Sequence, residues 1–140
     1  WGTSSSCVMA GGRNNDGPGS SNNTTESYNG SSWTNGPTLI QAKYGAGMTQ
    51  CGGTNNGSGY IAGGSNQALS PSNLNTTQKW NGSSWTSVGN LLNSLNGAGG
   101  GGSPSAGIIG GGTNDESGTA NQAASTTFVS GPTSVTIETS

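Results

Sequence analysis

The sequence contains no histidine and few charged residues, and each shortage narrows the functions that are open to it. Without histidine the chain lacks the commonest general base, proton shuttle and metal ligand. Its 3 basic residues are too few for a phosphate-binding surface, so nucleic acid is not an expected partner. No apolar run approaches the roughly 18 residues that cross a bilayer, so we expect no membrane insertion.

The 5 acidic residues offer little for catalysis. Asp115 and Glu116 are adjacent, but a calcium site would need several more oxygen ligands, so we expect a solvated loop there. A glycosidase needs two carboxylates across a cleft, and Asp16 with Asp115 is a conceivable pair because both follow Gly-Gly turns. The serines have no neighbouring base to activate them. We therefore predict a chain that is not an enzyme and that binds no cofactor or metal.

Apolar side chains are also scarce: 26% of the 140 residues are hydrophobic, and 28 residues are glycine. Such a composition often belongs to disordered chains. Here the net charge is only −2 and the aromatic residues recur in register, so we predict folded β-structure. Gly, Asn, Ser and Thr would then form turns and closely approached strands.

A repeat of roughly 50 residues, a period typical of β-repeat proteins, organises what is present. The segment Tyr28–Trp33 returns as Trp80–Trp85, 52 positions later, and Phe128 takes the first aromatic position of a degenerate third copy. The glycine pair after Ala10 returns after Ala62. We expect one repeat domain, 1–140, with units near 1–36, 37–89 and 90–140.

Each unit has room for four short strands, and the first unit lacks its first strand in our reading. We predict no helix. The eleven predicted strands are 7–10, 23–28, 31–34, 44–51, 60–62, 74–80, 83–88, 96–102, 106–112, 124–129 and 134–139. The edge of the strand at 7–10 is therefore expected to lack a partner within its own unit, and such an edge can pair with another chain.

Two Asn-Gly pairs mark the hairpin tips. Asn29-Gly30 and Asn81-Gly82 are predicted as type I′ turns in which both residues have positive φ. The cysteines leave two readings open. Cys7 and Cys51 are either small buried residues in strands or a disulfide, and the repeat does not place them in facing positions.

These residues resemble a kelch-type β-propeller blade: a hydrophobic strand ending in Gly-Gly, an aromatic residue some sixteen positions later, a tight turn and a tryptophan. The resemblance implies tandem four-stranded antiparallel blades. It also implies that Trp33 and Trp85 pack between blades, and that Tyr28, Trp80 and Phe128 lie in the core. The competing reading of the tryptophans is stacking on sugar rings.

The Asn-Gly-Ser-Ser-Trp units and Gly-Ala-Gly segments, with low charge, are also similar to the kelch-like repeats of structural and appendage proteins of marine bacteriophages. Propellers close with four to eight blades, and this chain has fewer than three. The ring would then need other copies, or the chain is part of a longer product. The first residue, Trp1, suggests the latter or processing. A β-prism or β-trefoil is the alternative fold.

Loops rich in amide and carboxylate groups follow the Gly-Gly turns and should share one face of the molecule. Together with aromatic residues outside the repeat positions, they form our candidate glycan contacts: Trp1, Arg13, Asn14, Asp16, Tyr44, Asn66, Asn114 and Asp115. The sequence thus predicts an extracellular or virion structural and adhesive module, such as a bacteriophage appendage or capsid-decoration protein. Its expected partners are copies of itself and a cell-surface glycan. The alternatives are a secreted lectin and a subunit of an extracellular filament.

Overall fold

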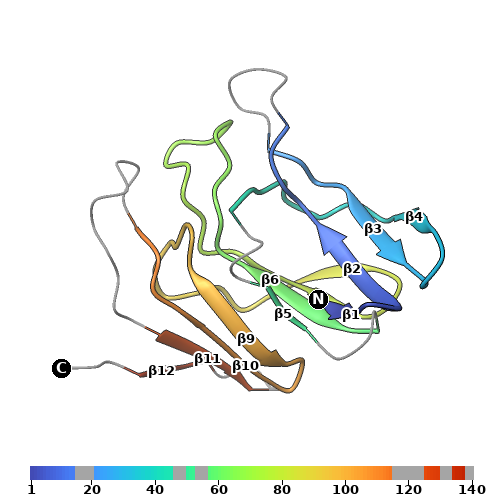
Figure 1. The fold of residues 1–140 in the computed structure, drawn as a ribbon. Coiled ribbons are helices and arrows are strands. Elements are labelled where there is room, and N and C mark those ends of the chain that lie inside the picture. Colours follow the sequence, from blue (N-terminus) through green and yellow to red (C-terminus); the bar gives the residue numbers. More distant parts are fainter. Residues whose placement is uncertain (15–20, 46–49, 53–56, 115–124, 130–133, 138–140) are drawn as a thin grey trace.

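A computed structural model describes residues 1–14, 21–45, 50–52, 57–114, 125–129 and 134–137. For 50–52, 125–129 and 134–137 it describes the backbone alone. Every regular element in these ranges is a β-strand, and no helix occurs among them (Figure 1). The predicted all-β class is confirmed.

The strands form three antiparallel sheets of four, each in sequence order. Sheet 1 contains β1 (Gly2–Thr3), β2 (Ser6–Ala10), β3 (Thr25–Tyr28) and β4 (Trp33–Gly36). Sheet 2 contains β5 (Gln50–Gly52), β6 (Gly59–Ala62), β7 (Thr77–Trp80) and β8 (Trp85–Val88). Sheet 3 contains β9 (Gly99–Ser103), β10 (Ala106–Gly110), β11 (Ser125–Val129) and β12 (Ser134–Ile137). Sheet 2 lies between the other two in Figure 1.

The first unit is not short of a strand, and that prediction was wrong. β1 pairs with β2 through Gly2–Cys7 and Thr3–Ser6. Trp1 extends the pairing, because its nitrogen donates to the Val8 carbonyl at 3.0 Å and its carbonyl accepts from the Val8 N–H at 2.9 Å. A strand of two residues is too short to show the alternation by which sequence patterns reveal strands.

The hairpin tips also differ from the predicted type I′ turns. Gly30 and Gly82 have φ of 94° and 98°, but no residue other than glycine has positive φ among the described residues. Asn29 and Asn81 were therefore wrongly assigned positive φ. The loops are four residues long, 29–32 and 81–84, instead of the two that a type I′ hairpin needs.

The asparagine side chains explain this geometry. The Oδ1 atom of Asn29 accepts hydrogen bonds from the backbone N–H groups of Ser31 at 3.0 Å and Ser32 at 2.9 Å. In the second hairpin, Asn81 binds the next two serines in the same way. Because the side chain supplies the acceptor that closes the turn, the asparagine backbone needs no left-handed conformation.

In sheets 1 and 2 the Gly-Gly pair after the second strand hydrogen-bonds to the segment that leads to the next sheet. We call this segment the connector; it includes 37–45 after sheet 1 and 89–98 after sheet 2. Gly11 N–H donates to the Thr24 carbonyl, and Gly12 N–H donates to the Lys43 carbonyl at 2.8 Å. A Cβ atom on Gly11, whose φ is 72°, would lie 2.7 Å from that same carbonyl oxygen. Gly63, one repeat later, would meet the Leu95 carbonyl oxygen at 2.5 Å. The glycines are therefore required by close backbone approach.

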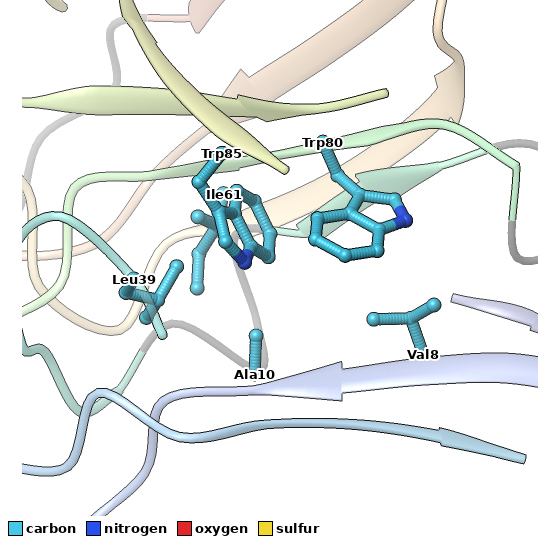
Figure 2. Close-up of a cluster of buried hydrophobic side chains, with 6 residues drawn as sticks. All are labelled: Val8, Ala10, Leu39, Ile61, Trp80 and Trp85. Atoms are coloured by element: carbon cyan, nitrogen blue, oxygen red, sulfur yellow. The ribbon is translucent and has the colours of Figure 1, made fainter. Parts of the chain in front are cut away.

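Sheet 1 packs on sheet 2 through a cluster rich in aromatic side chains. Figure 2 shows Val8 and Ala10 of β2 facing three residues of sheet 2: Ile61, Trp80 and Trp85. Leu39, from the connector, completes the buried set. Sheet 2 packs on sheet 3 through smaller side chains: Ala62, Leu91, Leu95, Ala98 and Ile109.

The connector after sheet 1 also buries a lysine. Lys43 is 0% exposed, and its Nζ donates to the carbonyl of Thr76 at 3.0 Å and to its hydroxyl at 3.2 Å. Burial lowers the pKa of Lys43 from 10.5 to about 8. The buried Gln78 side chain accepts from Ile40 N–H and donates to the Gln41 carbonyl, so the connector is held to β7 by polar groups.

Cys7 is half-buried on β2 and carries a free thiol, so the structure does not show the disulfide alternative.

Candidate functional site

The candidate ligand-binding site is a cluster of Arg13, Tyr44 and Gln67 at the ends of sheets 1 and 2 that follow the Gly-Gly turns. The Arg13 guanidinium carbon lies 5.4 Å from the centre of the Tyr44 ring. Its Nη2 donates to Gln67 Oε1 at 3.4 Å. A cation at this distance from an aromatic face is attracted by the ring quadrupole. The contact joins three segments that are distant in sequence.

Backbone pairing holds this cluster in place. Tyr44 and Ser65 exchange two backbone hydrogen bonds, both 2.9 Å long. Ser65 also bridges to Asn73, and Arg13 bridges to Ser21. The Ser21 hydroxyl donates to the Ser65 carbonyl at 3.5 Å. The backbone of Arg13 and of Tyr44 is therefore held by pairing, and this fixes the positions of their Cα atoms relative to each other.

The cluster presents three kinds of group at the surface. Arg13 and Gln67 are exposed, and Tyr44 is half-buried. The guanidinium offers only donors, the amide offers both donors and an acceptor, and the tyrosine offers an apolar ring with a hydroxyl. This combination suits a neutral ligand that carries many hydroxyl groups.

Ser65 Oγ, beside this cluster, is buried and has no hydrogen-bond partner among the described residues. The residue is 1% exposed, so its hydroxyl is directed into the protein. We therefore assign it no contact with a ligand.

The other residues predicted to contact a glycan differ in their exposure and in their distance from this cluster. Asn66 is next to the cluster but only 9% exposed, and its Oδ1 accepts from Ala68 N–H within its own loop. Asn14 is exposed beside Arg13, and Asn114 is exposed at the matching segment of the third unit. Asp16 and Asp115, including the conceivable glycosidase pair, lie outside the described residues.

Trp1 does not join this cluster. It packs edge-on against Trp85 with ring centroids 5.8 Å apart, and a Cβ atom on Gly59 would lie 2.4 Å from its ring. The sequence reasoning also selected Asn66 where the structure brings Gln67 to the arginine. The amide-rich loop after the second Gly-Gly pair contains both residues, and the sequence alone does not show which of its amides points toward Arg13.

A second notable surface is the outer face of sheet 1, defined here by Met9, Tyr28 and Trp33. Tyr28 and Trp33 are in contact, with ring centroids 5.0 Å apart at an interplanar angle of 35°. Trp33 is 47% exposed and Met9 is 58% exposed, while Tyr28 is half-buried. The resemblance implied that Trp33 packs between blades, but no sheet covers it in the part of this chain that the structure describes.

The equivalent pair in sheet 2 is buried. Trp80 and Trp85 lie 5.2 Å apart and are 3% and 7% exposed. The Trp85 indole N–H donates to the Thr25 hydroxyl of sheet 1 at 2.9 Å. The side chain of Phe128, at the third such position, lies outside the described residues.

Comparison of the chain with protein-family models found no match, and comparison with curated proteins found none either. No three His, Cys, Asp or Glu side chains gather as a metal site in the part of the chain that the structure describes. The same residues include no helix that is long and apolar enough to cross a membrane.

Proposed function

We propose that this chain is a non-catalytic, extracellular or virion structural and adhesive module, built from kelch-like blades, that contacts glycans and assembles with copies of itself. The observation that carries the adhesive part is the placement of Arg13 over Tyr44 beside Gln67. The three four-stranded sheets support the blade assignment, because each repeat unit forms one sheet with the same strand order.

The chemistry of the cluster favours a glycan over a charged ligand. A sugar presents hydroxyl groups as donors and acceptors and a ring with apolar C–H faces. Guanidinium and amide groups match the hydroxyls, and an aromatic ring matches the apolar face. The chain's net charge of −2 with only 3 basic residues gives no strong field for capturing an anionic polymer.

The proposed source, a bacteriophage appendage or capsid-decoration protein, rests on the resemblance of the Asn-Gly-Ser-Ser-Trp units. The hairpin tips that carry these units are exposed and are closed by asparagine side chains. They are polar without being charged, which is consistent with a surface that faces solvent outside a cell.

A glycan array with the purified chain tests the adhesive role, followed by titration of the best sugar into wild type and Arg13→Ala. We expect sub-millimolar binding that free sugar competes away, weakened at least tenfold by the substitution. Lys79→Ala is the matched control, because Lys79 Nζ lies 5.5 Å from the centre of the Tyr60 ring in a similar contact on sheet 2. No binding by wild type, or equal loss with both variants, would remove the glycan contact from the proposal.

A filament subunit is the second candidate function, and it is favoured by the exposed Trp33, which lies against Tyr28 on the outer face of sheet 1. Negative-stain images of purified material separate the candidates: fibres support the filament, and decorated virions support the appendage or decoration role. Binding on the array without any assembly would instead favour a secreted lectin.

A further inference from the structure

Inside the chain, one face of sheet 1 packs on one face of sheet 2, and we call this contact the internal junction. The faces of sheets 1 and 3 that are turned away from sheet 2 carry residues equivalent to the two sides of this junction. In antiparallel pairing, residues directly opposite one another lie on the same face of the sheet. In sheet 2, Trp80 pairs with Trp85 and faces sheet 1. In sheet 1, Tyr28 pairs with Trp33 at the same register. The Tyr28–Trp33 pair therefore lies on the face that, in sheet 2, is covered by another sheet.

The second strand of each sheet shows the same correspondence. Ile61 is 0% exposed and packs toward sheet 1. Met9 stands at the equivalent position, 52 residues earlier, and is 58% exposed. The outer face of sheet 1 thus presents apolar side chains whose counterparts in sheet 2 are buried. It also carries Glu26, which pairs with Met9 at the position that the buried Gln78 holds in sheet 2.

Sheet 3 supplies the other half of the junction. The residues of sheet 1 that cover the tryptophans of sheet 2 are Val8 and Ala10. Their register equivalents in sheet 3 are Ile108 and Gly110, two positions apart on β10. Ile109 between them is buried toward sheet 2, so Ile108 lies on the opposite face, where it is 45% exposed.

The polar bond of the internal junction also has a register equivalent. Trp85 donates to Thr25, which pairs with Gly36 and Ala10 in sheet 1. In sheet 3 the position opposite Gly110 is Ser125, again a hydroxyl residue.

We propose that the outer face of sheet 1, with Met9, Tyr28 and Trp33, docks on the Ile108 face of sheet 3 in a second copy of this chain. The contact repeats the internal packing of sheet 1 on sheet 2, so its occupant is a sheet of the same repeat. This inference rests on the self-assembly included in the proposed function and is independent of the glycan contact. Because two different faces meet, the contact is head-to-tail and builds a ring or an open filament.

The test is a measurement of mass in solution at micromolar concentration, using sedimentation of wild type, Trp33→Glu and Ile108→Glu. We expect wild type to be larger than one chain and each variant to be a monomer. An equimolar mixture of the two variants should then give a heterodimer, because each retains the face that the other lacks. Leu69→Glu is the control, since Leu69 is 44% exposed in the loop between β6 and β7 of sheet 2 and belongs to neither face.

Circular dichroism melting should show that the variants are folded, and Met9→Glu provides a second, more exposed substitution on the sheet 1 face. A wild-type monomer would overturn both the self-assembly and this contact. A wild-type oligomer that all the face variants leave intact would overturn the contact alone. Dissociation by Trp33→Glu without effect of Ile108→Glu would indicate a symmetric sheet 1 contact and overturn the head-to-tail arrangement. Equal dissociation by Leu69→Glu would also count against it. Glycan binding by the monomeric variants reports separately on the Arg13 site.

Discussion

Trp33 and Trp85 occupy the same position in two nearly identical hairpins, yet one is 47% exposed and the other 7%. The local geometry of the two is alike: each is paired with an aromatic residue across the hairpin, and each hairpin is closed by an asparagine side chain. What differs is the presence of a covering sheet. Whether the tryptophan of a hairpin is buried therefore depends on whether another sheet covers that face of its own sheet.

The two junctions themselves differ in chemistry although their backbones are equivalent. Lys43 and Leu95 occupy the same place, since the carbonyl of each accepts from the second glycine of a Gly-Gly pair. The first junction encloses an ammonium group and a glutamine, whereas the hydrophobic cluster at the second consists of aliphatic side chains. The same backbone arrangement therefore accommodates a buried lysine at one junction and a buried leucine at the other.

Replacing each of the two tryptophans by alanine in turn should give the largest difference in the free energy of unfolding. Trp85→Ala leaves a cavity at the first junction and should lower the free energy of unfolding by about 3–5 kcal/mol. Trp33→Ala in the dilute monomer should cost about 1 kcal/mol, because it loses mainly the contact with Tyr28. Urea denaturation checks both values. Equal losses would mean that the two tryptophans are equally covered.

The buried lysine should make stability depend on pH. Burial lowers the pKa of Lys43 to about 8 in the folded chain, while in the unfolded chain it stays near 10.5. Between these values the unfolded state binds more protons, so stability rises with pH. The rise should total roughly 3 kcal/mol. Urea denaturation from pH 7 to pH 11 measures it.

Lys43→Leu makes the first junction resemble the second and should remove that rise. Lys79→Leu is the matched control, a lysine-to-leucine change at a half-buried position of β7, and its pH profile is compared with that of Lys43→Leu. A pH profile of Lys43→Leu that matches wild type would show that another group is responsible.

The hairpin glycine should have a smaller effect. Gly82 has φ of 98°, and an added Cβ atom would lie 3.0 Å from the Gly57 carbonyl oxygen. Gly82→Val should destabilise the chain by roughly 1–3 kcal/mol because a β-branched residue is strained there. Gly89→Val is the matched control, since a Cβ atom there would meet nothing within 4 Å. Unchanged melting temperatures for both variants would contradict the positive φ.

A difference of similar size should separate two buried threonines. The Thr25 hydroxyl accepts from Trp85, whereas the Thr77 hydroxyl, at the equivalent position of sheet 2, has no partner among the described residues. Thr25→Val should cost about 1–3 kcal/mol by leaving a buried indole N–H unpaired, and Thr77→Val should be near neutral. Thermal melts of the two variants should therefore diverge; coincident melts would argue against the Trp85 bond.

Much of the strand pattern was predictable from the repeat. All eleven predicted strands overlap observed ones, because glycine pairs, Asn-Gly tips and alternating residues mark their ends locally. β1 was missed because two residues carry no periodic signal. The backbone of Asn29 was mispredicted because its side chain replaces the backbone conformation that the dipeptide usually signals.

The features that were missed depend on tertiary contacts. A lysine is expected at the surface, so nothing local to Lys43 indicates burial. The exposure of Trp33 follows from which sheet covers which face, which one hairpin cannot encode. Arg13 and Tyr44 were both selected as contact residues, but their contact with each other depends on how unit 1 meets unit 2.

The central claim is that the covering sheet decides why Trp85 is buried and Trp33 is exposed, and oxidative footprinting read by mass spectrometry tests it most directly. The two tryptophans are followed separately as the protein is concentrated from nanomolar to tens of micromolar. We predict that Trp85 is protected throughout, whereas Trp33 reacts in dilute solution and becomes protected as copies associate. Reaction of Trp33 that stays constant at every concentration, or reaction of Trp85 as fast as that of Trp33, would contradict the account.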